Sequence, residues 1–286
     1  MKLGIIGLGL IGGTIAKSLN SKHIVSAYDI SKDTLTYALE NKIIHQAYDN
    51  ISNFLKDNDV IYLCLYPEMI IDFFKSNKSI IKNDTLFIEI SGIKTNLIEK
   101  LEKLEKLEIK NFDIVFTHPI AGRELVGVKN SDKNIFFNGN YAIIENKKNK
   151  QNNIDLTYKL AKEMGFKNIS IISAQLHDEL LAYTSQLTHI ISLSLVNSYK
   201  ENVNLSHFTG DSYRDLTRIA NINIDLWMDL FVNNKDFLLS KITDFQNHIE
   251  QFKSAISCND KVKLAELMNQ AKNLHNKFLE ESRNES

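Results

Sequence analysis

The chain has 286 residues, of which 43% are hydrophobic, so it is long enough to bury a full core and to form two domains. Its formal net charge is -1, which provides no bulk electrostatic attraction to nucleic acid. Cys64 and Cys258 stand far apart in the sequence, so we expect neither a disulfide framework nor a metal site, as in a protein of the reducing cytoplasm.

The first predicted element is a short apolar strand over Leu3–Ile6 that leads into a glycine turn. Gly7 permits a tight turn, Gly9 lets the backbone approach a pyrophosphate, and Gly12 lets the next helix pack against the strand. That helix points its free N–H groups at the phosphates. The turn therefore predicts a dinucleotide site formed by Gly7, Leu8, Gly9, Leu10, Ile11 and Gly12.

Asp29 completes this nucleotide-binding pattern. It follows the second predicted strand, Ile24–Tyr28, about 20 residues after the glycines, where an acid meets the ribose 2′-hydroxyl. An acid there repels a 2′-phosphate, so we predict NAD rather than NADP, although Lys32 nearby would soften this preference. The alternative is a plain glycine turn followed by an aspartate that caps a helix before Ser31.

The first part of the chain alternates short apolar runs with amphipathic runs, which predicts a Rossmann-type doubly wound sheet with helices on both faces. We assign this dinucleotide-binding domain to residues 1–173. Ligands of such sheets bind at the carboxyl ends of the strands. Further strands are predicted at Val60–Leu65, Leu86–Ile90, Phe112–Phe116, Tyr141–Ile144 and Ile169–Ile172, and helices at Asp33–Glu40, Ile51–Lys56 and Ile154–Met164.

Residues 174–286 show helical patterns only, which predicts an all-α substrate and dimerisation domain. The helix over Gln175–Tyr199 carries apolar residues around most of its circumference, so we expect it to be buried on all sides. Its uncharged part is too short and too polar to span a membrane. Interleaving with a second copy would bury it, so we expect a homodimer. Further helices are predicted at Ile224–Ile256 and at Lys261–Glu281, with Asp260 as N-cap of the second. Whether the first of them is continuous or broken stays open.

His118 is the strongest catalytic candidate. Because Pro119 disfavours a helical conformation at the preceding residue, the imidazole should project from the end of a strand at the cofactor edge. A neutral imidazole there can accept a proton from a substrate hydroxyl while hydride leaves the same carbon. The alternative is a histidine that only bonds backbone groups in a turn.

Two further candidates come from the helical region. His189 lies on an otherwise apolar helix, and Arg218 offers a planar fork for a carboxylate. Taken alone, His189 could be a core histidine, and Arg218 could form a helical ion pair with Asp215, three residues earlier.

These segments together resemble the prephenate dehydrogenase family, in its monofunctional form from tyrosine biosynthesis. The resemblance covers nearly the whole chain. The segments that carry it are the glycine turn, Glu89–Lys94 (EISGIK), His118–Gly122 (HPIAG) with Glu124, Leu176–Asp178 (LHD), Ser185–His189 (SQLTH), and Arg214–Ala220 (RDLTRIA) followed by Trp227.

The resemblance implies an NAD-dependent oxidative decarboxylation of prephenate to 4-hydroxyphenylpyruvate. His118 matches the family histidine that bonds the ring hydroxyl, and Arg218 matches the arginine that binds a substrate carboxylate. His189 matches a second histidine that contacts substrate. The remaining matches are polar residues around the site, namely Arg214, Asp215 and Glu124.

One position departs from the family pattern. Family members often have serine at the position of Gly92, where it orients the histidine and the nicotinamide, whereas here Ser91 precedes it. We keep Ser91 as a candidate catalytic residue. Because the chain begins at the first strand and ends soon after a helical pair, we also expect no fused chorismate mutase domain and no ACT-type regulatory domain.

Three other functions stay open at this point. An arogenate dehydrogenase would carry the same motifs. A β-hydroxyacid dehydrogenase would need a catalytic lysine in the helical domain, for which there is no strong candidate. A non-catalytic NAD-sensing module would not need His118, His189 and Arg218 to meet over the nicotinamide site.

Overall fold

The computed structural model describes residues 1–105, 112–123, 125–200 and 203–284. The chain divides into two compact units, Met1–Asn234 and Lys235–Ser286. The first unit holds the whole sheet and the helices that follow it, up to the end of the tenth α-helix. The domain boundary after residue 173 stays a prediction of the sequence.

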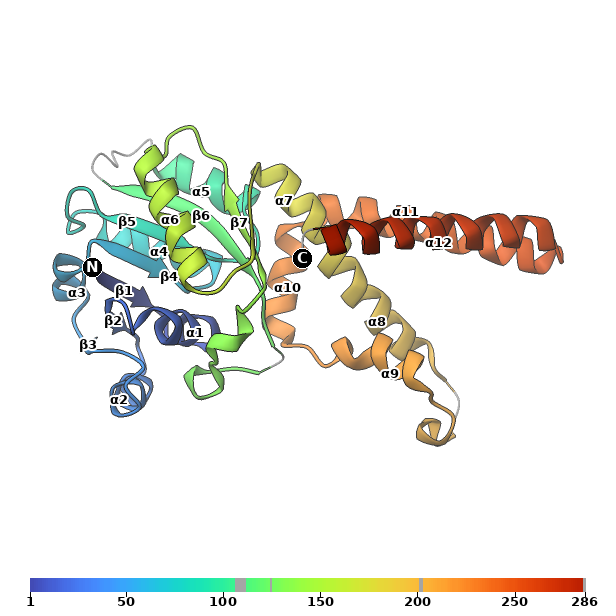
Figure 1. The fold of residues 1–286 in the computed structure, drawn as a ribbon, viewed down its shortest axis with the longest axis horizontal. Coiled ribbons are helices and arrows are strands. Elements are labelled where there is room, and N and C mark those ends of the chain that lie inside the picture. Colours follow the sequence, from blue (N-terminus) through green and yellow to red (C-terminus); the bar gives the residue numbers. More distant parts are fainter. Residues whose placement is uncertain (106–111, 124, 201–202, 285–286) are drawn as a thin grey trace. The chain divides into compact units, whose positions relative to one another are not determined.

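A twisted sheet forms the centre of the first unit (Figure 1). Among the described residues it has eight strands in the order β3-β2-β1-β4-β5-β6-β7-β8, parallel throughout except for the antiparallel pair β6 and β7. All the predicted strands are confirmed, and the short β3 is an addition. The strands are β1 (Lys2–Ile6), β2 (Ile24–Tyr28), β3 (Gln46–Tyr48), β4 (Val60–Leu63), β5 (Leu86–Glu89), β6 (Asp113–Ile120), β7 (Asn140–Ile144) and β8 (Asn168–Ile172).

Helices cover both faces of this sheet, as the sequence predicts for a doubly wound fold. In β4, Val60 and Tyr62 belong to one hydrophobic cluster, while Ile61 and Leu63 belong to the other, because successive side chains point to opposite faces. Residues of α1 (Leu10–Leu19), α2 (Lys32–Glu40) and α6 (Gln151–Glu163) join the first cluster. Residues of α3 (Ile51–Asp57), α4 (Pro67–Asn77) and α5 (Thr95–Glu105) join the second.

The long helix predicted over residues 175–199 is present but interrupted. It consists of α7 (Ala174–Leu181), one π-helical turn (Ala182–Gln186) and α8 (Leu187–Ser198). Within the single chain Leu187 is buried, but Leu180 is 47% exposed and Val196 39%. Burial on all sides, which is expected together with a second copy, stays a prediction. Two more helices follow in this unit, α9 (Asp211–Thr217) and α10 (Ile224–Asn233).

The second unit is a pair of packed helices, α11 (Lys235–Ser257) and α12 (Lys261–Asn284). Asp260 caps α12 as predicted, since its carboxylate accepts a hydrogen bond of 2.9 Å from the Lys263 backbone N–H. The helix predicted over residues 224–256 is broken at Asn234, which separates α10 from α11. Over the described part of the chain, every helix is too short or too polar to cross a membrane.

Candidate active site

The glycine turn between β1 and α1 has the geometry of a phosphate-binding loop. Gly7 has a φ of +91°, which favours glycine, and its N–H donates to the Tyr28 carbonyl at 3.0 Å. A Cβ at Gly12 would lie 2.0 Å from the Gly7 carbonyl oxygen, so only glycine allows this approach of helix and strand. A Cβ at Gly9 would meet nothing within 4 Å, which leaves open space for a pyrophosphate at the start of α1.

Asp29 ties the end of β2 to this turn. Its carboxylate accepts hydrogen bonds from the backbone N–H groups of Leu8, at 2.7 Å, and Ser31, at 2.8 Å. Ser31, not Asp29, is the N-cap of α2, because its side chain accepts from the Thr34 N–H. The alternative of a capping aspartate is therefore wrong, and the acid lies beside the glycine turn as a ribose-binding acid should.

His118 lies in β6, paired with Ala142 of β7, rather than in a turn. Its Nδ1 is 2.9 Å from Nε2 of His177, and the two rings meet edge to face. Burial, followed by the neighbouring His177 and Lys94, holds the pKa of His118 well below the ordinary histidine value. The imidazole is therefore neutral at pH 7, which is the form that a proton acceptor needs.

A buried aspartate continues this contact. Asp178, on α7, is 2.7 Å from Nδ1 of His177 and also accepts hydrogen bonds from the backbone N–H groups of Lys94, at 3.0 Å, and Thr95, at 2.8 Å. These two N–H groups lie at the N-terminus of α5, where the helix dipole stabilises a carboxylate. The sequence predicts no role for His177 or Asp178, although the adjacent His-Asp pair was a usable signal.

A buried ion pair lies at the end of β5. Lys94 Nζ is 2.5 Å from Glu89 Oε2, and both side chains are fully buried. Burial lowers the pKa of Lys94, while the Glu89 carboxylate opposes that change. The other Glu89 oxygen accepts from the Ser91 N–H. This pair fixes the turn that follows β5, directly beside the strand that carries His118.

Ser91 uses its hydroxyl within its own turn. Its Oγ donates to the Ile93 carbonyl at 3.3 Å, and the side chain is buried. A Cβ at Gly92 would lie 2.8 Å from Cδ2 of Leu230, so a serine there would have to displace the end of that leucine. The catalytic role of Ser91 stays a prediction.

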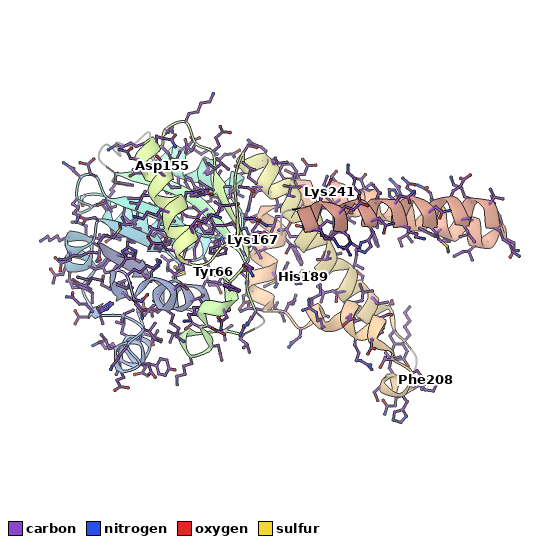
Figure 2. The ribbon with its side chains drawn as sticks, in the orientation of Figure 1. Tyr66, Asp155, Lys167, His189, Phe208 and Lys241 are labelled. Carbon is purple, nitrogen blue, oxygen red and sulfur yellow. The ribbon has the colours of Figure 1, made fainter. Side chains whose placement is uncertain are left out.

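The candidates of the helical region form a second, more exposed group. His189 lies on α8 (Figure 2), where its Nδ1 is 2.8 Å from the Ser185 carbonyl. Its ring lies against that of Trp227, with 3.6 Å between centroids and an interplanar angle of 31°. Arg218 opens a short 3₁₀ turn that packs against α8. The meeting of His189 and Arg218 with His118 over the nicotinamide stays a prediction.

The polar residues predicted around the substrate are exposed or lie outside the described residues. The Arg214 guanidinium donates to the Asp211 carboxylate at 2.5 Å and to the Thr209 carbonyl at 3.0 Å. Asp215 is exposed on the same helix, α9. Glu124 lies outside the described residues.

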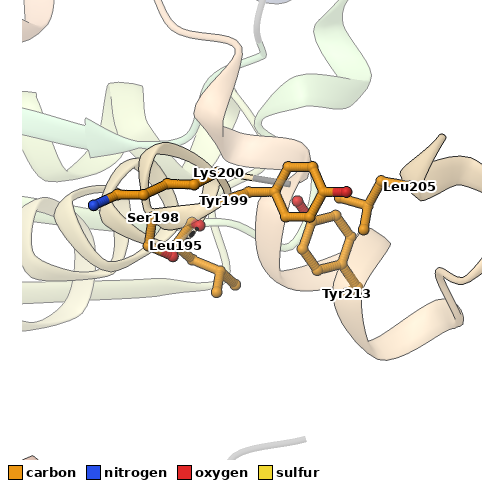
Figure 3. A pocket seen from close by; sticks show the side chains of 6 residues that line it. All are labelled: Leu195, Ser198, Tyr199, Lys200, Leu205 and Tyr213. Carbon is orange, nitrogen blue, oxygen red and sulfur yellow. Dashed lines mark hydrogen bonds between the residues drawn. The ribbon is translucent and has the colours of Figure 1, made fainter. Parts of the chain in front are cut away.

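A surface hollow of about 360 Å³ lies at the end of α8 and beside α9 (Figure 3). None of the predicted site residues lines it, so we assign it no part in the chemistry. Its lining residues are Leu195, Ser198, Tyr199, Lys200, Leu205 and Tyr213.

A doubly wound sheet, a glycine turn joined to an acid, and a neutral histidine on the sheet define a nicotinamide-dependent dehydrogenase. Family models identify the particular kind. The model for the nucleotide-binding domain of prephenate dehydrogenase matches residues 14–170, and the model for its dimerization domain matches residues 173–270. The chain belongs to the prephenate dehydrogenase family.

Individual relatives agree with this assignment. The chain is 26% identical over 266 residues to the cyclohexadienyl dehydrogenase of Zymomonas mobilis, covering 90% of this chain and 89% of the relative. It is 24% identical over 264 residues to the prephenate dehydrogenase of Bacillus subtilis, covering 90% of this chain and 70% of the relative.

Solved structures show the same fold. A prephenate dehydrogenase from A. aeolicus, in complex with hydroxyphenyl propionate and NAD⁺, is 25% identical and has a TM-score of 0.86, with 97% of this chain and 98% of that chain covered. The arogenate dehydrogenase of Synechocystis is 21% identical with a TM-score of 0.82, covering 97% and 100%. The predicted family, fold class, enzyme class and NAD cofactor are confirmed.

Proposed function

We propose that this chain catalyses the NAD-dependent oxidative decarboxylation of prephenate to 4-hydroxyphenylpyruvate, in tyrosine biosynthesis. The observation that carries the proposal is the half-buried, neutral His118 on β6, in a chain of this family. A neutral imidazole is the group that the reaction needs, because the oxidised carbon bears a hydroxyl that must lose its proton.

The residues present fit NAD. The open space at Gly9, the turn at Gly7 and the carboxylate of Asp29 provide the pyrophosphate and ribose contacts of a dinucleotide. Bound NAD supplies the hydride acceptor. The backbone of residues 7–12 then orients the dinucleotide at the start of α1.

Two groups of residues share the work of proton transfer and substrate binding. His118 accepts the ring-hydroxyl proton as the carbon that bears it is oxidised, and loss of carbon dioxide makes the ring aromatic. Arg218 binds a substrate carboxylate, and His189 makes a second contact. Arg218 must not favour the carboxylate of the bound substrate over the transition state, since only differential binding accelerates the step. Arg214, Asp215, Glu124 and Ser91 complete the proposed site.

We propose that the enzyme acts as a cytoplasmic homodimer through a helical domain of residues 174–286, behind a dinucleotide-binding domain of residues 1–173. The partly exposed apolar side chains of Leu180 on α7 and Val196 on α8 support the dimer, because a second copy would remove them from water. The match to a dimerization domain supports it further. Free thiols at Cys64 and Cys258 support a reducing compartment.

The test is absorbance at the reduced-nicotinamide band, with purified protein, NAD, and prephenate or arogenate in parallel cuvettes. We expect the signal to rise with prephenate. A larger rate with arogenate would make the protein an arogenate dehydrogenase instead. Tight NAD binding without a rise in either cuvette would contradict both and favour a sensing module.

The role of His118 is tested by His118→Asn. We expect kcat to fall by roughly 10²- to 10⁴-fold, the usual contribution of a general base, with little change in the KM for prephenate. His248→Asn, which changes an exposed histidine of α11, is the matched control and should keep the wild-type rate. A near-normal kcat in His118→Asn would overturn the general-base role.

A further inference from the structure

Three side chains form a continuous hydrogen-bonded row from the sheet to the N-terminus of α5. His118 Nδ1 meets His177 Nε2 at 2.9 Å, and His177 Nδ1 meets Asp178 Oδ1 at 2.7 Å. His177 is 2% exposed and Asp178 is fully buried, so water does not compete for the bond between these two side chains. The three residues come from β6 and α7, which are far apart in the sequence.

Asp178 is held as a carboxylate. Burial alone would favour its neutral form, but the hydrogen bonds from His177 and from the Thr95 N–H outweigh it and lower the pKa of Asp178. Within the described part of the chain, its two oxygens bond only to donors: His177 Nδ1 and the backbone N–H groups of Lys94 and Thr95. The Asp178 carboxylate, which can only accept hydrogen bonds, therefore ends the row and faces His177.

The α7 backbone at Asp178 is also fixed. Its carbonyl accepts from Asn234 Nδ2 at 2.9 Å, and the same amide donates to Gln186 Oε1 at 2.8 Å. Gln186 in turn donates to the Leu230 carbonyl at 2.8 Å. The aspartate is thus anchored through both its side chain and its main chain, so its position does not depend on the histidine.

The carboxylate sets the direction of the hydrogen bonds in the row. Because Asp178 accepts, His177 Nδ1 carries a proton, and in a neutral His177 the Nε2 atom is an acceptor. His118 Nδ1 must then carry the proton of the bond between the two rings. The remaining nitrogen of His118, Nε2, is left with a free lone pair, which is the form that a general base requires.

We propose that His177 and Asp178 are positioning residues that hold His118 in the tautomer with Nε2 unprotonated. The proposal rests on the proposed role of His118 as the base. When Nε2 takes the substrate proton, the Nδ1 proton stays in the bond to His177, and the positive charge on His118 is met through His177 by the Asp178 carboxylate. No other proton has to move, so the row works by orientation and by electrostatic stabilisation.

Asp178→Asn tests the direction of the hydrogen bonds in the row, because asparagine has almost the same shape as aspartate. The amide oxygen can still accept from the N–H groups of Lys94 and Thr95, while the amide NH₂ now donates to His177 Nδ1. That reverses both following bonds and puts the proton on His118 Nε2. We expect a fall in kcat of at least about 100-fold, with the NAD dissociation constant unchanged. Asp72→Asn, which removes an exposed carboxylate from α4, is the matched control.

Two readouts separate positioning from mere folding. Histidine ¹⁵N shifts, assigned by loss of the His118 signals in His118→Asn, should show an unprotonated Nε2 in the wild type and a protonated Nε2 in Asp178→Asn. In the His118→Asn background, Asp178→Asn should lower kcat no further, because the two residues act as one unit. A second loss of full size, or an unprotonated Nε2 in Asp178→Asn, would overturn the proposal.

A second variant keeps the proposal testable should Asp178→Asn fail to fold. His177→Leu removes the partner of His118 Nδ1 but leaves Asp178 its two backbone donors, and we expect kcat to fall by about tenfold with KM unchanged. Wild-type kcat in His177→Leu would overturn the proposal. This failure is distinct from failure of the proposed function, in which His118→Asn itself keeps a near-normal kcat.

Discussion

The two halves of the candidate site differ in how firmly the chain holds them. At the sheet, Lys94, His118, His177 and Asp178 are linked by hydrogen bonds and are buried or half-buried. On the helices, the Arg214 side chain is 60% exposed and bonds within its own segment. Proton transfer needs a base whose tautomer and orientation are fixed beforehand, whereas a carboxylate-binding group can stay solvated until the substrate arrives.

The largest effect is expected on stability, when one ion pair is broken in each half of the site. Lys94→Met leaves the Glu89 carboxylate buried without its partner, so we expect the free energy of unfolding to fall by about 3–5 kcal/mol. Arg214→Met breaks an exposed pair with Asp211, and we expect less than about 1 kcal/mol. Urea denaturation of both variants measures the difference.

The double variant Glu89→Gln/Lys94→Met is the control for the buried pair. The introduced glutamine amide removes the buried charge but keeps an acceptor for the Ser91 N–H, so most of the lost stability should return. If Lys94→Met lowers the free energy of unfolding no more than Arg214→Met does, the contrast between the two halves does not hold.

A smaller effect is expected from the exposed half, and it concerns binding. Arg218→Ala would remove the charged hydrogen bonds that we propose to the substrate carboxylate, each worth roughly 1.5–3 kcal/mol, so the KM for prephenate should rise by about 10- to 100-fold. We expect kcat to change much less, in contrast to His118→Asn. Steady-state kinetics with NAD in excess separates the two parameters. Arg283→Ala on α12 is the control, and a loss confined to kcat would contradict the binding role.

Local sequence patterns predicted one part of this molecule well. The strands, the glycine turn and the cap at Asp260 follow from neighbouring residues, and Pro119 placed His118 on extended backbone. The break at Asn234, which the sequence left open, lies where Asn234 bonds backbone and side chain groups of the 178–186 segment.

The contacts that organise the site could not be predicted in this way. Asp178 bonds residues 83 and 84 positions earlier, and no periodicity links α7 to the start of α5. The sequence offered Asp215 as a helical partner of Arg218, and only the structure shows that Arg214 on the same helix donates to Asp211. The apolar circumference of the helix over 175–199 predicted burial together with a second copy, and within one chain Leu180 and Val196 are still 47% and 39% exposed.

The smallest effect is a pH dependence that belongs to the buried half. The pKa of His118 is lowered in the folded chain, so below the unfolded value of about 6.5 the unfolded chain binds a proton that the folded chain does not. This contribution to stability is present above pH 6.5 and is lost as the pH falls toward the folded pKa, by up to about 1.4 kcal/mol per unit. Wild type should therefore lose more stability than His118→Asn between pH 7 and pH 5 in parallel urea titrations. Equal losses in the two proteins would mean that His118 is not held neutral, and the proposed orientation of the row from Asp178 to the base would then be wrong.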